Sequence, residues 1–182
     1  MMNVANILSL TRLALLPFII LLFFVSAKWD WAAWACLVLF LIGAITDFLD
    51  GWVARTFNQV TAFGTFIDPV SDKIFVVTIL LMLVATSRIE GVFVLCVILI
   101  LMREFLVSGI REYLGPRGIK VPVTNLAKWK TAAQMAATAL LILAPVALWA
   151  KIGGLVLLVA ATILTVLTGW HYLKTSLPHI MK

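Results

Sequence analysis

Residues 46–73 read TDFLDGWVARTFNQVTAFGTFIDPVSDK, a polar stretch between long apolar segments. This stretch holds half of the eight acidic residues of the chain, namely Asp47, Asp50, Asp68 and Asp72. Carboxylates are costly to bury in apolar surroundings unless they are paired or bind a cation, so ionisable residues in membrane-spanning segments usually have a function. Any fold of this chain must therefore accommodate four carboxylates that lie close together in the sequence.

The composition indicates a membrane protein. Of the 182 residues, 64% are hydrophobic and 12% are charged, and the mean hydropathy is +1.15. A helix needs about 20 apolar residues to cross the hydrocarbon layer of a bilayer. Segments of roughly this length recur at about 7–26, 31–57, 69–86, 91–113, 128–149 and 153–173. The sequence therefore predicts an all-α integral membrane protein with six transmembrane helices around a polar cavity, forming a single domain over residues 1–182.

The distribution of positive charge predicts how the helices are oriented. The net charge of +6 is compatible with a nucleic acid partner, but eleven of the fourteen basic residues fall at or near the same ends of the predicted spans. Only Lys28, Arg88 and Lys151 fall at the opposite ends. Lysine and arginine accumulate on the cytoplasmic side of membrane proteins. We therefore expect no nucleic acid partner, and we expect both termini and the cavity to face the cytoplasm from the inner membrane of a bacterium.

The spacing of the aspartates predicts two acidic helix faces. A helix advances by about 100° per residue, so Asp47 and Asp50 share a face with the small residue Gly51. Asp68 and Asp72 are separated by four residues and share a face of the following helix. Both faces are expected near the inner edge of the hydrocarbon layer.

A turn is expected between these two helices, at about 56–67. Pro69 suits the first turn of the second helix, and Asp68 suits its N-cap. A helical hairpin of this kind brings two carboxylates from each helix together.

Four carboxylates at one place repel one another unless cations lie between them. Arg55 and Lys73 can offset two of the charges, so structural ion pairs are one interpretation. Hard divalent cations such as Mg²⁺, which prefer carboxylate oxygens, are another. A transporter for divalent cations or protons is a third, although the outer halves of the predicted spans are nearly uncharged. The number and arrangement of the acids favour the metal site.

The same residues match the signature of a known family. Residues 47–72 reproduce D-x2-D-G-x2-A-R-x8-G-x3-D-x3-D at every specified position. Near the N-terminus, the pattern N-x-L-S-x-x-R is formed by Asn6, Leu8, Ser9 and Arg12. The chain thus resembles the CDP-alcohol phosphatidyltransferases, and the resemblance covers effectively its whole length.

This resemblance implies an activity and a set of site residues. Members transfer the phosphatidyl group of CDP-diacylglycerol to an alcohol, release CMP, use two divalent cations (Mg²⁺ or Mn²⁺) and form homodimers. It implies that the metal ligands are Asp47, Asp50, Asp68 and Asp72. It implies that Asp68 and Asp72 are catalytic, with Asp72 as the general base on the acceptor hydroxyl. It further implies that the CDP group is contacted by Asp50, Gly51, Ala54, Arg55 and Gly64.

A second basic cluster bears on the acceptor alcohol. An acceptor that carries a phosphate needs cations around it, and the cytoplasmic ends of the fourth and fifth spans supply Arg103, Arg111, Lys128 and Lys130. Anchoring by the positive-inside rule is the simpler interpretation of any one of them, and Glu104 can pair with its neighbours. Residues 103–112 and 128–131 resemble the phosphatidylglycerophosphate synthase branch of the family, which uses sn-glycerol 3-phosphate. We therefore expect this acceptor, with inositol phosphate as the alternative.

Overall fold

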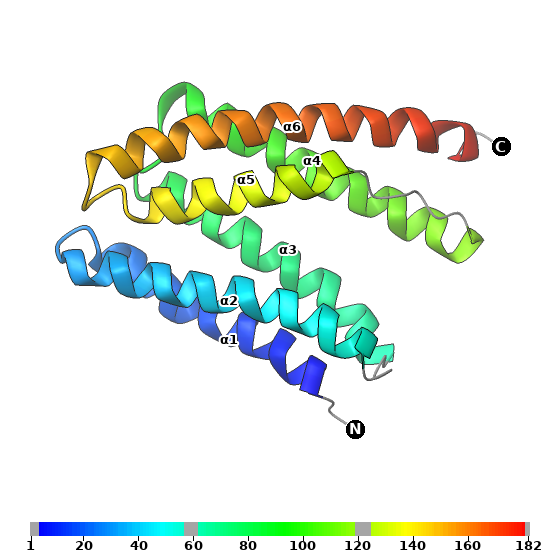
Figure 1. The fold of residues 1–182 in the computed structure, drawn as a ribbon, viewed down its shortest axis with the longest axis horizontal. Helices are drawn as coiled ribbons and strands as arrows, with labels where there is room; N and C mark the ends of the chain where they lie inside the picture. The colour runs from blue at the N-terminus through cyan, green and yellow to red at the C-terminus, as the bar shows by residue number, and fades with distance from the viewer. Residues whose placement is uncertain (1–3, 57–61, 119–124, 181–182) are drawn as a thin grey trace. The chain divides into compact units, whose positions relative to one another are not determined.

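A computed structural model describes residues 4–56, 62–118 and 125–180, and all regular structure in these ranges is helical. Six α-helices are present (Figure 1): α1 (Val4–Val25), α2 (Asp30–Thr56), α3 (Ala62–Ala85), α4 (Val94–Leu114), α5 (Asn125–Ile142) and α6 (Leu148–Ile180). Two short 3₁₀ helices flank α4, namely η1 (Gly91–Phe93) and η2 (Gly115–Arg117). The all-α prediction is therefore confirmed for the described residues.

Length and hydropathy identify two of the described helical segments as long enough to cross a membrane. These are Gly91–Arg117 and Leu148–Ile180, each with a mean hydropathy of 2.3. Only 22% and 39% of their most apolar windows are buried, so most of these apolar side chains face outward, as they do towards lipid. This supports a membrane protein. The apolar parts of α1 and α2, Ser9–Val25 and Asp30–Thr46, are shorter, so the count of six spans stays a prediction.

Helix α6 spans Leu148–Ile180 rather than about 153–173, and two further boundaries differ from the prediction beside a proline. The turn expected at 56–67 is wrong for its second half, because α3 already begins at Ala62 and contains Pro69 in its interior. A proline inside a helix removes one backbone hydrogen bond, but packing can override such a local preference. Gly64, which precedes Pro69, is buried.

The second difference concerns the fifth predicted span, which ends at Ile142 rather than at 149. Pro145 lies in the turn that follows, and the residue before a proline avoids helical geometry. The chain then re-enters a helix at Leu148, the start of α6.

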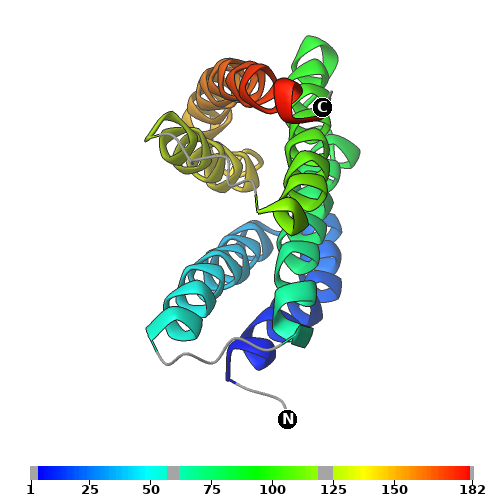
Figure 2. The same cartoon turned by 90° about the vertical axis from the view of Figure 1, so that its right-hand side faces the viewer.

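The described helices form two compact units. Unit 1 contains Met1–Arg88 and Leu141–Lys151, and unit 2 contains Ile89–Leu140 and Ile152–Lys182. In unit 1, α1 lies against both α2 and α3 (Figure 1 and Figure 2). The fully buried Ile19 of α1 belongs to its apolar core.

Helices α2 and α3 approach each other closely within unit 1. The rings of Phe40 and Phe75 are stacked with their centroids 5.9 Å apart. One turn along α2, a Cβ atom built on Gly43 would lie 2.6 Å from Cζ of Phe75. The absence of a side chain at Gly43 therefore allows the Phe75 ring to pack directly against the α2 backbone.

A buried arginine joins distant segments of unit 1. Arg88 follows α3, and its guanidinium donates hydrogen bonds to the hydroxyl of Ser26 and, at 2.5 Å, to the carbonyl of Ile142. Its guanidinium carbon also lies 4.5 Å from the centroid of the Phe23 ring. Burial lowers the pKa of Arg88 to about 10, so the side chain is still charged at neutral pH. Arg88 thus links the turn after α3 to the turn after α1 and to the last residue of α5.

Unit 2 is built around the contacts of α4 with α5 and α6. One face of α4 is buried, through Val97, Ile100, Val107, Ile110 and Leu114. Where α4 meets α6, a Cβ atom on Gly169 would lie 2.9 Å from Cγ of Arg103. Where α5 meets α6, a Cβ atom on Gly153 would lie 3.5 Å from Cδ1 of Leu140. The polar residues predicted to bind the acceptor lie on α4 and α5 of this unit.

Candidate active site

The backbone places the signature aspartates on two consecutive helices of unit 1. Asp47 and Asp50 lie in the last three turns of α2, and Asp68 and Asp72 lie in the first three turns of α3. The two helices are separated by residues 57–61, so a short connection joins the acidic ends, as the hairpin prediction requires. The side chains of Asp47, Asp50, Gly51, Ala54 and Arg55, and with them any contacts they make, lie outside the described residues.

Asp68 is held by a hydrogen bond from α1. The hydroxyl of Ser9 donates to Oδ1 of Asp68 at 2.7 Å, and the Ser9 side chain is fully buried. Asp68 itself is half-buried. Since a carboxylate has two oxygens, this bond fixes one of them and leaves Oδ2 available for another partner.

Asp72 is the more exposed carboxylate of α3. Its side chain is 55% exposed, whereas that of Arg12, with Nη1 at 3.8 Å from Oδ1 of Asp72, is 2% exposed. The cation is therefore buried behind the carboxylate, which itself stays open to solvent. Ser9 and Arg12 are three residues apart on α1, and Asp68 and Asp72 are four apart on α3, so one face of α1 meets one face of α3.

The donor set suits a hard divalent cation. Asp68 and Asp72 offer carboxylate oxygens, which Mg²⁺ and Mn²⁺ prefer. Within the described residues, no group of three or more His, Cys, Asp or Glu side chains comes together to hold a metal ion. The third and fourth acids of the predicted site, Asp47 and Asp50, are among the side chains outside that description.

The basic residues predicted to bind the acceptor fall in unit 2, and two of them share a carboxylate. The ammonium group of Lys130 on α5 donates a hydrogen bond to Oε1 of Glu104 on α4. Arg103 contacts the same oxygen at 3.3 Å and the hydroxyl of Thr168 on α6 at 3.5 Å. Lys130 is buried and Arg103 largely so. Glu104 therefore pairs with its neighbours, which was one of the interpretations of the sequence.

Arg111 is held differently, by an aromatic side chain of α6. Its Nε and Nη2 donate to the hydroxyl oxygen of Tyr172 at 3.1 and 2.9 Å. Its guanidinium carbon also lies 5.2 Å from the centroid of the Tyr172 ring. Lys128 is exposed at the start of α5. The four predicted cations thus include two that share Glu104, one that contacts Tyr172 and one at the surface.

Sequence reasoning missed the partners that α6 supplies to this cluster. Five buried residues of α6 that carry hydroxyl groups are spaced by three or four positions and so share one helix face: Thr162, Thr165, Thr168, Tyr172 and Ser176. Within the described structure, the hydroxyls of Thr165 and Ser176 have no hydrogen-bond partner. A polar stripe at helical spacing in an otherwise apolar segment is the signal that could have revealed them.

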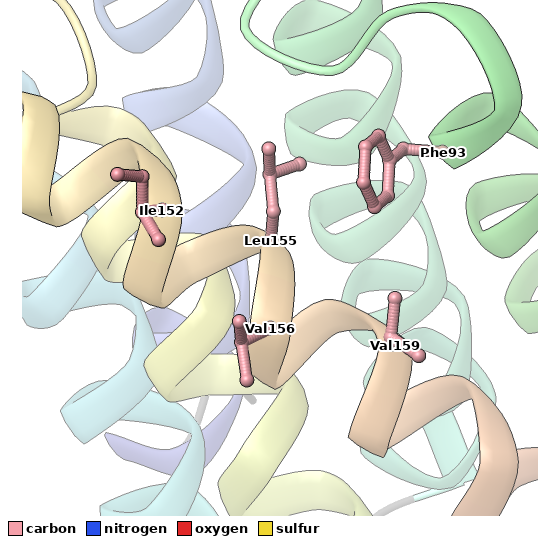
Figure 3. A pocket seen from close by; sticks show the side chains of 5 residues that line it. All are labelled: Phe93, Ile152, Leu155, Val156 and Val159. Carbon is pink, nitrogen blue, oxygen red and sulfur yellow. The ribbon is translucent and has the colours of Figure 1, made fainter.

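Unit 2 also contains an apolar pocket, shown in Figure 3. It has a volume of about 340 Å³ and is lined by Phe93, Ile152, Leu155, Val156 and Val159. No titratable or hydrogen-bonding side chain lines it, so it lacks the groups that phosphate chemistry needs. The candidate site is therefore assigned to the polar clusters rather than to this pocket.

Comparison with known proteins gives a consistent result. A family model described as CDP-alcohol phosphatidyltransferase matches residues 2–170. A protein of Rickettsia typhi is 41% identical over 177 residues, covering 96% of this chain and 97% of that protein. A protein of Rickettsia bellii is 40% identical over 175 residues, covering 94% of each chain. A protein of Escherichia coli K12 is 35% identical over 176 residues, covering 96% of this chain and 94% of that protein. All three relatives are named CDP-diacylglycerol–glycerol-3-phosphate 3-phosphatidyltransferase.

Proposed function

This chain belongs to the CDP-alcohol phosphatidyltransferase family, and on that basis we propose that it transfers the phosphatidyl group of CDP-diacylglycerol to sn-glycerol 3-phosphate. The products are phosphatidylglycerophosphate and CMP, so the enzyme acts in phospholipid biosynthesis. One observation carries the proposal: relatives whose names state this activity are similar to the chain over nearly its full length. The intact signature of residues 47–72 agrees with it.

The reaction replaces the phosphoanhydride bond of CDP-diacylglycerol with a phosphoester bond to the acceptor. The acceptor hydroxyl oxygen attacks the phosphorus of the phosphatidyl group, and the bond from this phosphorus to the oxygen of CMP breaks. We assign the hydroxyl proton to Asp72, whose solvent-exposed carboxylate is open to an incoming alcohol. General-base assistance of this kind is worth about 10²–10⁴-fold in rate.

Two divalent cations, Mg²⁺ or Mn²⁺, are the proposed cofactors. Their proposed ligands are Asp47, Asp50, Asp68 and Asp72. When bound, such cations neutralise charge on the diphosphate as CMP departs. The chain's own contribution is to hold the carboxylates in place, and the hydrogen bond from Ser9 to Asp68 does so on α3.

The nucleotide and the acceptor are assigned to different residues. For the CDP group we keep the set implied by the signature: Asp50, Gly51, Ala54, Arg55 and Gly64. For the acceptor phosphate we propose Arg103, Arg111, Lys128 and Lys130. Lys130 and Arg103 lie together on one oxygen of Glu104, and since one carboxylate offsets only one of the two positive charges, a net positive charge remains there for a phosphate.

The remaining assignments concern the membrane. We propose six spans, both termini and the active site on the cytoplasmic side of a bacterial inner membrane, and a homodimer. The outward-facing apolar residues of α4 and α6 and the distribution of lysine and arginine support insertion and orientation.

The proposal is tested with purified full-length protein in detergent. The protein is supplied with CDP-diacylglycerol, Mg²⁺ and one of four additions: glycerol 3-phosphate, inositol 1-phosphate, serine or buffer. CMP release that depends on glycerol 3-phosphate and disappears with a chelator supports the assignment. Faster turnover with inositol 1-phosphate would instead identify the alternative acceptor, and full turnover in chelator would contradict the metal site.

A further inference from the structure

We propose that Ser9 and Arg12 of α1 are positioning residues that fix the catalytic carboxylates of α3. Ser9 orients Asp68 for cation binding, and Arg12 holds Asp72 in the direction from which it accepts a proton. This inference rests on the proposed function, since it assumes that Asp68 binds a cation and that Asp72 is the base.

The two contacts form one continuous interaction between the helices. Ser9 meets Asp68 at 2.7 Å, and Arg12 meets Asp72 at 3.8 Å. These two contacts are one helical turn apart. Burying a serine and an arginine in a helix as apolar as α1 is costly unless both side chains are paired.

The hydrogen bond from Ser9 restricts the orientation of Asp68, which is a proposed metal ligand. A carboxylate that accepts a hydrogen bond through Oδ1 is restricted in rotation, so Oδ2 keeps one direction. Hydrogen bonds to ligating carboxylates orient the ligand, and removing them typically costs about 10–100-fold in metal affinity. The fully buried position of Ser9 strengthens this effect, because water cannot replace its hydroxyl.

The ion pair with Arg12 determines where the side chain of Asp72, the proposed general base, lies. The 3.8 Å separation between Nη1 of Arg12 and Oδ1 of Asp72 is that of an ion pair rather than of a short hydrogen bond. A buried guanidinium needs a nearby anion, and this requirement keeps the Asp72 side chain turned towards α1. The exposed part of Asp72 remains available to the acceptor hydroxyl.

Metal binding without turnover tests the role of Ser9. We would measure Mn²⁺ binding to the full-length protein by electron paramagnetic resonance and, separately, the Mg²⁺ concentration for half-maximal activity. Ser9→Ala is expected to weaken Mn²⁺ binding by about 10–100-fold and to raise the half-maximal Mg²⁺ concentration in parallel. Ser9→Thr, which keeps the hydroxyl, is expected to restore both.

A matched control separates positioning from packing. Ser26 is also a buried serine, lies just after the other end of α1 and donates to the carbonyl of Phe23 at 2.7 Å. Ser26→Ala is expected to lower thermal stability without changing Mn²⁺ binding. If Ser9→Ala behaves like Ser26→Ala, the inference is wrong. If the wild-type protein binds no Mn²⁺, the proposed metal site is wrong as well. A failure of the role of Ser9 can thus be distinguished from a failure of the proposed function.

The role of Arg12 is tested by a split between kinetic constants. Arg12→Met is expected to lower kcat by about 10-fold or more while KM for glycerol 3-phosphate changes little, because Asp72 is misplaced and the residues assigned to the acceptor phosphate are not. Arg12→Lys keeps the positive charge and is the control for a variant that fails to fold. It is expected to recover part of kcat. An unchanged kcat in folded Arg12→Met, or an equal loss in both variants, would overturn this assignment.

Discussion

Single side chains of unit 2 differ in how firmly they are held. Lys130 is buried against Glu104, whereas Lys128, two residues earlier on the same helix, is exposed. A buried cation is desolvated and has one orientation, and an exposed one is screened by water and salt. The two lysines should therefore contribute unequally to acceptor binding, although the sequence gives them equal weight.

Replacing Lys130 is expected to weaken acceptor binding strongly. A hydrogen bond to a charged group is worth about 1.5–3 kcal/mol, so Lys130→Met should raise KM for glycerol 3-phosphate by about 10–100-fold. Lys128→Met should raise it less. The exposed Lys174 of α6 provides a control, and Lys174→Met should leave KM within about 2-fold. Initial rates at varied acceptor concentration measure all three, and equal KM values for Lys130→Met and Lys174→Met would contradict the assignment.

For single residues, the sequence predicts which side chains share a helix face but not which side chains of other helices they contact. The spacing of Asp68 and Asp72 on one helix face follows from local geometry, and the structure has them on one helix. Their partners Ser9 and Arg12 lie about 60 residues away. Such pairings depend on which helices pack together, which helical periodicity does not encode.

Among the helices, the contact of α2 with α3 depends on one small residue. Gly43 allows the Phe75 ring to approach the α2 backbone, and the Phe40 ring stacks on Phe75 beside it. Because α2 and α3 carry the four aspartates, this contact also sets how the acidic ends of the two helices are spaced.

Adding a methyl group at Gly43 should destabilise unit 1. The new Cβ would lie 2.6 Å from Phe75, and overpacking of this kind costs about 1–3 kcal/mol. Thermal unfolding in detergent should therefore show a lower Tm for Gly43→Ala. Gly109→Ala is the control, because a Cβ there meets nothing within 4 Å and alanine favours a helix. A Tm for Gly43→Ala equal to that of Gly109→Ala would disprove the close contact.

Helix boundaries show where sequence reasoning fails at this scale. The existence of six helical segments follows from their apolar length, and all six are present. The start of α3 was predicted too late because Pro69 is a strong local signal for the first turn of a helix, whereas α3 begins at Ala62. The end of α5 was predicted too late because a turn of five residues separates two apolar helices.

Across the whole molecule, unit 1 joins segments that are far apart in the sequence. Arg88 contacts Ser26 and Ile142, which are 62 and 54 residues away. Its cation is buried, so its hydrogen bonds cannot be replaced by water. This residue should therefore matter for stability rather than for catalysis.

Removing the Arg88 cation should lower stability and leave the kinetics unchanged. Loss of two charge-assisted hydrogen bonds and one cation–π contact is expected to cost about 2–4 kcal/mol, so Arg88→Met should unfold at a lower temperature. Arg117 is a matched control, since its guanidinium stacks on Tyr113 at 3.7 Å but is exposed. Arg117→Met should keep its Tm, and a similar loss in both variants would contradict a special role for Arg88.

The contact between α1 and α3 also bears on the order of biogenesis. During translation α1 leaves the ribosome first, so the hydroxyl of Ser9 and the guanidinium of Arg12 are already present when the acids of α3 arrive. Each carboxylate can then meet its partner as soon as α3 has been synthesised, instead of remaining an isolated charge. Delivering α3 before α1, as a circular permutation would, should therefore reduce the yield of folded protein.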